Sequence, residues 1–304
     1  MGPATLSAVN LTKKFGSVMA VDDLSFDVAA GRVTGFLGPN GAGKTTTLRM
    51  LLGLVLPTSG KALVKGVKYV NLEDPIRTLG AHLDSGSFQP GRTGRDHMRV
   101  ACAEGGISTS RINELLDLVG MTGAADRKMG GYSLGMLQRL GLATALLGDP
   151  QILLLDEPAN GLDPEGIRWL REFLRAYADG RKTVFLSSHL LSEIQLLAHD
   201  VIIINHGKLV AAGPVRDLEA VEGGSVEVAA EDNAALAAAL SSAGFSASLQ
   251  GATEQDQPGM VLISGGTAAE VGRAALDAGI ALTHLAEKNS GLEDLFVSLV
   301  GENQ

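Results

Sequence analysis

The stretch that decides the fold of this chain reads Gly38-Pro39-Asn40-Gly41-Ala42-Gly43-Lys44-Thr45, and Thr46 follows it. It matches the phosphate-binding pattern G-x-x-x-x-G-K-[ST] at every fixed position. The apolar residues 33–37 before it are typical of a strand, and residues 45–53 after it are typical of a helix. A glycine-rich turn with a chance Lys-Thr pair is the alternative interpretation. The strand–loop–helix order favours a phosphate site.

These residue types suit a phosphate chain bound with a magnesium ion. Glycines let backbone N–H groups turn toward phosphate oxygens without a Cβ in the way, and the start of the helix adds the positive end of its dipole. The ammonium of Lys44 can reach the terminal phosphates, and the hydroxyl of Thr45 can ligate Mg²⁺. We therefore expect a nucleotide site built from residues 38–46.

A second strand is predicted to bring carboxylates to this site. Residues 152–155 form a wholly apolar run that ends in Asp156 and Glu157. Asp156 can hold Mg²⁺ directly or through water, and Glu157 can orient or deprotonate a water in line with the γ-phosphate. A buried strand that ends in a solvated Asp-Glu pair is the alternative. The presence of the phosphate-binding pattern favours the catalytic interpretation.

The composition is that of a cytosolic α/β protein. The chain has 304 residues and a single cysteine, Cys102, for which we expect a small apolar role in a helix. No apolar run approaches the ~18 residues that span a bilayer, and no secretory signal is evident at the N-terminus.

Charge is distributed unevenly along the chain, whose net charge is −9. Residues 1–220 hold 23 Lys and Arg against 22 Asp and Glu, whereas residues 221–304 hold 2 against 12. This asymmetry predicts a domain boundary near residues 219–225. It also argues against nucleic acid as a partner of the acidic part.

Strands and helices alternate through residues 1–220, which indicates a mainly parallel sheet covered on both faces. Residues 6–15 and 21–28 are expected to form an antiparallel β subdomain, and residues of about 88–148 an α-helical subdomain. In residues 221–304 the order is β-α-β-β-α-β, as in small ferredoxin-like α+β domains, and an amphipathic helix is expected at residues 292–300. The predicted fold class is therefore an α/β P-loop NTPase followed by an acidic accessory domain.

At this point residues 5–217 resemble the ATP-binding subunit of an ABC transporter. The stretch Tyr132-Ser133-Leu134-Gly135-Met136-Leu137-Gln138-Arg139 resembles the family signature, in which Gly is most frequent at position 134 and Gln at position 136. The stretch Asn160-Gly161-Leu162-Asp163 resembles the family's D-loop, and His189 its switch histidine.

The resemblance implies roles for further residues. Ser133, Gly135, Gln138 and Asp163 would contribute to the nucleotide site, and His189 would act at the γ-phosphate with Glu157 and Lys44. Phe15 matches the aromatic residue that stacks on adenine, although strand core is an alternative at this position. Asp84 aligns with the Q-loop glutamine and could reach Mg²⁺ or water.

The resemblance also implies partners and a function. Two copies would clasp ATP face to face, each phosphate loop facing Ser133 and Gly135 of the other copy, and hydrolysis would separate them. A separately encoded membrane subunit would carry the substrate, with this chain peripheral on the cytoplasmic face of the cell membrane. The signature with a tail domain resembles exporters of antibiotics, bacteriocin-like peptides or other drugs.

Two other functions remain open. One is a soluble ABC ATPase that acts on ribosomes or DNA, which usually has two cassettes or a long coiled coil. The other is a regulatory nucleotide-binding module, which would not need Glu157 as a base.

Overall fold

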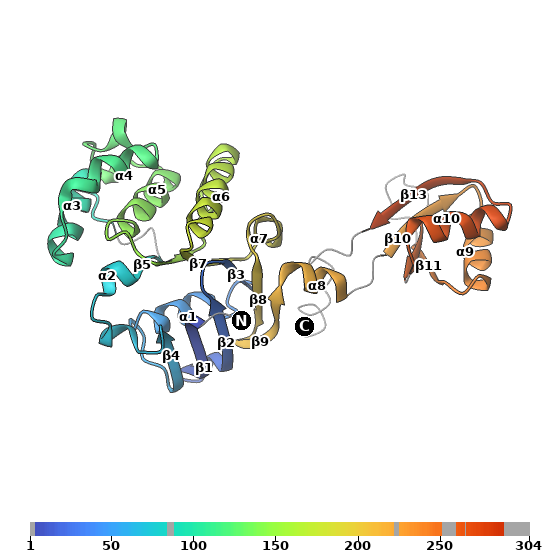
Figure 1. Ribbon diagram of the computed structural model, residues 1–304, viewed down its shortest axis with the longest axis horizontal. Helices are drawn as coiled ribbons and strands as arrows, with labels where there is room; N and C mark the ends of the chain where they lie inside the picture. Colours follow the sequence, from blue (N-terminus) through green and yellow to red (C-terminus); the bar gives the residue numbers. More distant parts are fainter. Residues whose placement is uncertain (1–3, 84–87, 222–224, 251–259, 265, 289–304) are drawn as a thin grey trace. The chain divides into compact units, whose positions relative to one another are not determined.

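The computed structural model describes residues 4–83, 88–221, 225–250, 260–264 and 266–288 (Figure 1). By its internal contacts the chain divides into two compact units, Met1–Gly213 and Pro214–Gln304. The division falls before the boundary predicted from charge, because β9 (Lys208–Pro214) is the last strand of the first unit's large sheet and α8 (Val215–Val221) belongs to the second unit. Every helix in the described ranges is too short or too polar to span a lipid bilayer.

The first unit is built on a six-stranded sheet of order β5-β6-β7-β3-β8-β9. Its other strands are β5 (Leu79–His82), β6 (Ile152–Asp156), β7 (Thr183–Ser188), β3 (Val33–Leu37) and β8 (Asp200–Asn205). The strands from β5 through β8 pair in parallel. All five residues of β3 and of β6 are buried, as expected of parallel strands covered on both faces.

An antiparallel sheet of order β2-β1-β4 packs against this core. Its strands are β1 (Ala4–Phe15), β2 (Val18–Ala29) and β4 (Ser59–Val64). Phe26 of β2 lies 5.5 Å from Phe36 of β3 and 5.7 Å from Phe185 of β7, measured between ring centroids. This aromatic cluster joins the two sheets, and Phe36 lies two residues before Gly38 of the phosphate loop.

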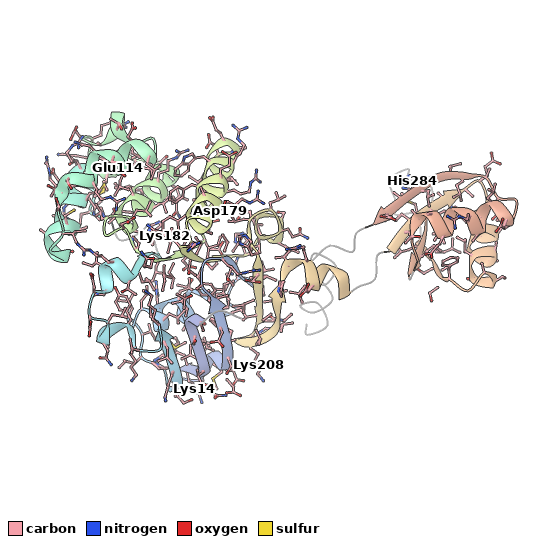
Figure 2. The ribbon with its side chains drawn as sticks, in the orientation of Figure 1. Lys14, Glu114, Asp179, Lys182, Lys208 and His284 are labelled. Carbon is pink, nitrogen blue, oxygen red and sulfur yellow. The ribbon has the colours of Figure 1, made fainter. Side chains whose placement is uncertain are left out.

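Helices surround the sheets of the first unit. They are α1 (Lys44–Leu51), α2 (Pro75–Thr78), α3 (Gly94–Gly105), α4 (Ile112–Leu118), α5 (Leu134–Ala145), α6 (Pro164–Asp179) and α7 (Leu191–Leu197). The segment from α3 to α5 enters the chain between β5 and β6 and forms the predicted helical subdomain. Figure 2 shows Glu114 of α4 at the far end of this unit from Lys14 of β1. Cys102 is buried on α3, as predicted.

The second unit has the predicted β-α-β-β-α-β order. After α8 come β10 (Ser225–Ala230), α9 (Asn233–Ser242), β11 (Ser246–Gln250), β12 (Met260–Ser264), α10 (Ala268–Asp277) and β13 (Leu282–Lys288). The strands form an antiparallel sheet of order β11-β12-β10-β13, in which Ser225 of β10 pairs with Lys288 of β13. The helix predicted at residues 292–300 lies outside the described residues.

Candidate functional site

The phosphate loop connects β3 to α1 and is packed closely on its neighbours. Gly43 precedes α1 with φ of 102°, and a Cβ at this position would lie 2.4 Å from the carbonyl oxygen of Ala20. A Cβ at Gly38 would lie 2.5 Å from the carbonyl oxygen of Ile204. Glycine is therefore required at both positions by the surrounding backbone and, at Gly43, also by the positive φ.

The loop borders an open cavity of about 340 Å³. The cavity is lined by one residue after β6, one residue after β7, the phosphate loop with the start of α1, and two neighbouring residues. In that order these are Glu157, His189, Pro39, Asn40, Gly41, Ala42, Gly43, Lys44, Thr45, Thr46, Ala20 and Asn160. The structure thus brings together the phosphate loop, the residue after β6 and the residue after β7. Parallel strands β6, β7 and β3 end at this edge of the sheet, which explains why residues so distant in sequence meet.

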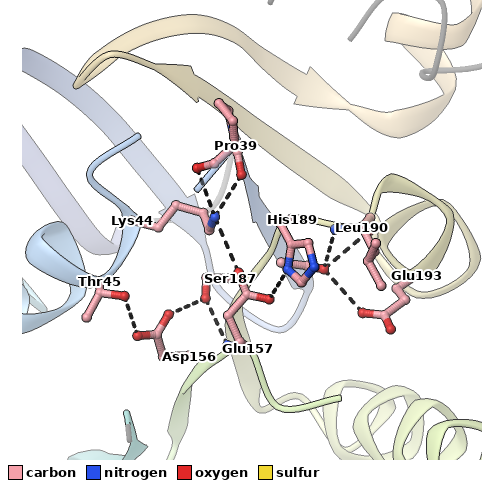
Figure 3. Close-up of polar contacts among 11 residues, drawn as sticks. Pro39, Lys44, Thr45, Asp156, Glu157, Ser187, His189, Leu190 and Glu193 are labelled. Carbon is pink, nitrogen blue, oxygen red and sulfur yellow. Dashed lines mark hydrogen bonds and ion pairs between the residues drawn. The ribbon is translucent and has the colours of Figure 1, made fainter. Parts of the chain in front are cut away.

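Lys44 is held inside the loop although it is charged (Figure 3). Its Nζ donates to the carbonyl oxygens of Gly38 at 2.7 Å and Pro39 at 3.3 Å. Glu157 Oε1 lies 3.3 Å from the same Nζ. These acceptors offset the cost of burying an ammonium group that is only 6% exposed. The charge is therefore fixed at the floor of the cavity.

Asp156 lies at the centre of a second network. Thr45 Oγ1 donates to its Oδ2 at 2.6 Å, and Ser187 Oγ donates to its Oδ1 at 2.5 Å (Figure 3). Ser187 Oγ also accepts from the backbone N–H of Glu157 at 2.9 Å. The Thr45 hydroxyl and the Asp156 carboxylate are hard oxygen donors side by side, which fits the ligand preference of Mg²⁺.

Glu157 and His189 face each other across the strand ends. Glu157 Oε2 and His189 Nδ1 are 2.7 Å apart, and the two side chains are 20% and 34% exposed. Glu157 has φ of 48°, an unusual value for a non-glycine residue that is worth noting at a functional site. Its carboxylate thus bridges the ammonium of Lys44 and the imidazole of His189 while remaining open to water.

A third carboxylate supports this region from α7. Glu193 Oε2 accepts from Ser188 Oγ at 3.2 Å, and the same hydroxyl accepts from the backbone N–H of Leu190 at 2.9 Å. Burial raises the pKa of Glu193, and the nearby charge of Glu157 acts in the same direction. Ser188 and Glu193 together fix the backbone that carries His189.

The signature residues lie elsewhere in the same chain. Ser133 is exposed and caps α5, its Oγ accepting from the backbone N–H of Met136 at 3.2 Å. A Cβ at Gly135 would lie 2.6 Å from the carbonyl oxygen of Gly161, so the start of α5 packs on the D-loop. Neither Ser133 nor Gly135 lines the cavity of its own chain. Their predicted contact with a second copy stays a prediction.

Two residues that were predicted to contact nucleotide make hydrogen bonds to other residues of the chain. Gln138 is buried, 7% exposed, and its Oε1 accepts from His82 Nε2 at 2.7 Å. Its side chain therefore points into the interior of its own chain, and its role in the nucleotide site stays a prediction. Asp163 caps α6 by accepting from the backbone N–H of Gly166 at 3.0 Å, and it does not line the cavity.

Phe15 and Asp84 complete the set of predicted residues. Phe15 is 48% exposed at the end of β1, with Lys13 Nζ 4.8 Å from its ring centroid. The strand-core alternative for Phe15 is therefore wrong, and its stacking role stays a prediction. Asp84 lies outside the described residues.

The sequence motifs did not identify Ser187 or Glu193 as parts of the site, and they placed Asn160 in the D-loop stretch without a role at the cavity. For Ser187 a signal existed, because it follows an apolar run just as Asp156 does. Nothing in the sequence shows that β6 and β7 are neighbours, and this adjacency is what places Ser187 against Asp156.

A phosphate loop between β3 and α1, a neighbouring strand that ends in Asp-Glu and a helical insertion between β5 and β6 define a P-loop ATPase. The comparisons assign its family. A family model described as "ABC transporter" matches residues 21–160, and one described as "Domain of unknown function (DUF8746)" matches residues 224–293.

Curated relatives extend this match over the whole chain. The chain is 37% identical over 301 residues to the bacitracin transport ATP-binding protein BcrA of Bacillus licheniformis, which covers 97% of each chain. It is 34% identical over 295 residues to BcrA of Enterococcus faecalis, covering 96% of this chain and 95% of that one. The lantibiotic transport ATP-binding protein SrtF of Streptococcus pyogenes is 37% identical over 205 residues, 67% of this chain and 89% of SrtF.

The chain belongs to the ABC transporter family as one of its ATP-binding proteins, and it is an ATPase. Solved structures agree on the fold. An ATP-binding subunit of an ABC transporter matches with a TM-score of 0.64 and 24% identity, over 71% of this chain and 92% of that one. A dimeric ATP-binding cassette in a post-hydrolysis state with ADP and Pi matches with a TM-score of 0.62 and 22% identity, over 69% and 98%. The predicted family and fold class are confirmed.

Proposed function

We propose that this chain hydrolyses ATP to drive export of an antibiotic-type small molecule or peptide through a separate membrane subunit. The observation that carries the ATPase part is the polar network at the cavity floor, in which Lys44, Glu157 and His189 are joined in one row. The export part rests on relatives that match nearly the full chain and are named for bacitracin transport.

Binding of the triphosphate falls to the phosphate loop. Its backbone N–H groups and the start of α1 favour negative charge, and Lys44 adds a full positive charge at the same place. Thr45 and Asp156 would hold Mg²⁺. Magnesium supplies neutralisation of the charge that develops on the phosphates.

Glu157 is the residue placed to act on the attacking water. Its carboxylate faces the cavity and can accept a proton from water, while its backbone is held by Ser187. His189 Nδ1 fixes one carboxylate oxygen, and its ring lines the cavity where the γ-phosphate would lie. These two residues therefore orient the nucleophile and the group under attack.

A second copy is needed to complete the site. Ser133 and Gly135 begin α5 but do not line their own chain's cavity, so a second copy would bring its α5 to the nucleotide. The dimeric cassette among the similar structures supports this arrangement. Loss of the γ-phosphate would remove contacts shared by both copies and release them.

The membrane part of the proposal follows from the same relatives. No helix among the described residues spans a bilayer, and the matched proteins are ATP-binding components of transport systems. We place the chain on the cytoplasmic face of the cell membrane, where ATP is available. The names of the relatives, which refer to bacitracin and lantibiotic transport, support an antibiotic as the class of substrate.

The test is the variant Glu157→Gln in the full chain. Loss of the base should lower ATP turnover by about 10²–10⁴-fold, leave ATP binding intact and trap a dimer with Mg-ATP. Turnover is measured by phosphate release and dimer formation by sedimentation velocity. Glu172→Gln, which alters an exposed glutamate on α6, is the matched control and should behave as the wild type. Full hydrolysis by a strictly monomeric Glu157→Gln chain would refute the proposal.

Export is tested separately with the membrane subunit. Cells that express the membrane subunit with the wild-type chain should resist a peptide antibiotic such as bacitracin. Cells that express the membrane subunit with the Glu157→Gln chain should remain sensitive. If cells with the wild-type chain are as sensitive as cells with the variant, and both chains are expressed, the proposed substrate class is refuted but the ATPase activity is not.

A further inference from the structure

A buried polar pair connects the large sheet to the signature helix α5. His82, the last residue of β5, and Gln138, on α5, are each 7% exposed. His82 Nε2 lies 2.7 Å from Gln138 Oε1. Because the amide oxygen can only accept, the imidazole carries its proton on Nε2.

The sequence of α5 makes room for this contact. A Cβ at Gly141 would lie 2.2 Å from the His82 ring, closer than any side chain could approach. Gly141 lies nearly one helical turn after Gln138, on the same side of α5. Glycine in a helix interior costs about 1 kcal/mol relative to alanine. The helix therefore carries an unfavourable residue at the position where the histidine packs against it.

The pair links two parts of the proposed ATPase site. His82 pairs with Leu155 of β6, the residue before Asp156. Gln138 follows the signature residue Ser133 by about 7.5 Å along the helix axis at 1.5 Å per residue. Neither His82 nor Gln138 lines the cavity, so neither contacts nucleotide bound there. The pair connects β5, the strand next to β6, to α5, the helix whose start is proposed to contact a second copy.

A hydrogen bond between buried groups restricts the sliding of a helix along a neighbouring strand more than apolar contacts do. Sliding α5 along β5 would leave His82 and Gln138 buried without this bond, which is costly, whereas apolar side chains accept small shifts. A second polar anchor of this part of the helix, Arg139, donates to the carbonyl oxygen of Val119 and packs over Trp169. Those contacts hold α5 to α4 and α6, not to the sheet.

We propose that His82 and Gln138 are positioning residues. They hold α5 at the position along β5 from which Ser133 and Gly135 can contact the nucleotide bound to a second copy. The inference rests on the proposed function and deepens it. It predicts that the pair controls dimer formation and turnover, but not the binding of ATP to the phosphate loop.

The test uses the full chain with both partners replaced, His82→Leu with Gln138→Leu, so that neither member of the pair stays buried without the other. Because apolar replacement of both partners is nearly neutral for stability, this double variant is expected to fold. Gln138→Glu, which keeps an acceptor oxygen for His82, is the rescue variant. Thr144→Val is the matched control, since the Thr144 hydroxyl donates to Leu140 of its own helix.

The first measurement needs no nucleotide. Amide hydrogen exchange at residues 135–137 should become about tenfold faster or more in the double variant, because loss of one hydrogen bond of about 1.4 kcal/mol changes a local opening equilibrium by that factor. Exchange should stay at the wild-type rate in Thr144→Val and return toward it in Gln138→Glu. Unchanged exchange in a folded double variant would overturn the inference.

The second measurement is dimer formation with Mg-ATP in the Glu157→Gln background. In the double variant the dimer dissociation constant should rise about tenfold or more, while the dissociation constant for a fluorescent ATP analogue on the monomer stays within about twofold. A dimer as tight as that of the parent would overturn the inference. If the parent itself binds ATP but forms no dimer, the proposed function fails, and the exchange result alone decides the positioning role.

Discussion

Ser187→Ala should destabilise the first unit, because the Ser187 hydroxyl makes two hydrogen bonds in its interior. Ser187 is fully buried on β7, and its Oγ serves two groups of the site at once. It donates to Asp156 Oδ1 and accepts from the backbone N–H of Glu157. Alanine leaves both groups without this partner in a place that water reaches poorly.

The magnitude follows from the two bonds. A hydrogen bond to a charged carboxylate contributes about 1.5–3 kcal/mol and a neutral one about 0.5–1.5 kcal/mol, so we expect a loss of about 2–4 kcal/mol. A domain of this size loses about 2–4 °C of Tm per kcal/mol, which gives a fall of about 4–16 °C. ATP turnover should fall as well, because Asp156 and Glu157 lose a common support.

The chain offers its own reporter for this measurement. Its single tryptophan, Trp169, lies on α6 in the first unit, so tryptophan fluorescence during urea unfolding follows that unit alone. The two units need not unfold together, and a probe confined to one of them avoids mixing their transitions.

Thr34→Val is the matched control. Thr34 is 1% exposed on β3, the strand next to β7, and its Oγ1 has no hydrogen-bond partner among the described residues. Because burial of an unpaired hydroxyl is itself costly, valine should leave stability unchanged or raise it by about 1 kcal/mol. If Ser187→Ala and Thr34→Val shift the urea midpoint equally, the two hydrogen bonds do not contribute as argued.

Three further predictions each concern a single residue. Burial raises the pKa of Glu193, so the folded state holds its proton more tightly than the unfolded state, and stability is lost as pH rises from the ordinary Glu value through the raised one. Glu193→Gln should therefore raise Tm at about pH 8 and change it little at about pH 4; an equal shift at both would contradict this reasoning. Gly43→Ala should weaken ATP binding by about tenfold or more in calorimetry, because its Cβ would meet the carbonyl oxygen of Ala20 at a positive φ; unchanged affinity would show that the loop relaxes freely. Tyr177→Phe removes a 2.6 Å hydrogen bond to the carbonyl oxygen of Pro150 and should cost about 1 kcal/mol in urea unfolding, and a neutral result would exclude that bond as a stabilising contact.

Much of the first unit could be predicted because its signals are local. The loop from Gly38 to Thr45 forces a strand before it and a helix after it, and Asp156 and Glu157 end an apolar run of strand length. Both patterns are contained in fewer than about 15 residues, so no knowledge of sheet order is needed to find them.

The rest of the site depends on contacts that sequence does not encode locally. Gln138 and Asp163 occupy motif positions, yet one faces the interior and the other caps a helix. Ser187 gained its role from the neighbouring strand, and Glu193 from a seven-residue helix too short to show a clear period. These outcomes are decided by tertiary packing, which overrides what a motif position alone suggests.

The pairing of Ser225 with Lys288 gives the second unit a practical property. Within the described residues its first and last strands, β10 and β13, are antiparallel neighbours, so the backbone enters and leaves this sheet at one end. A module with adjacent ends can be excised, or spliced into a surface loop of an unrelated host, without stretching either joint. Residues 225–288 can thus be moved between hosts as one unit.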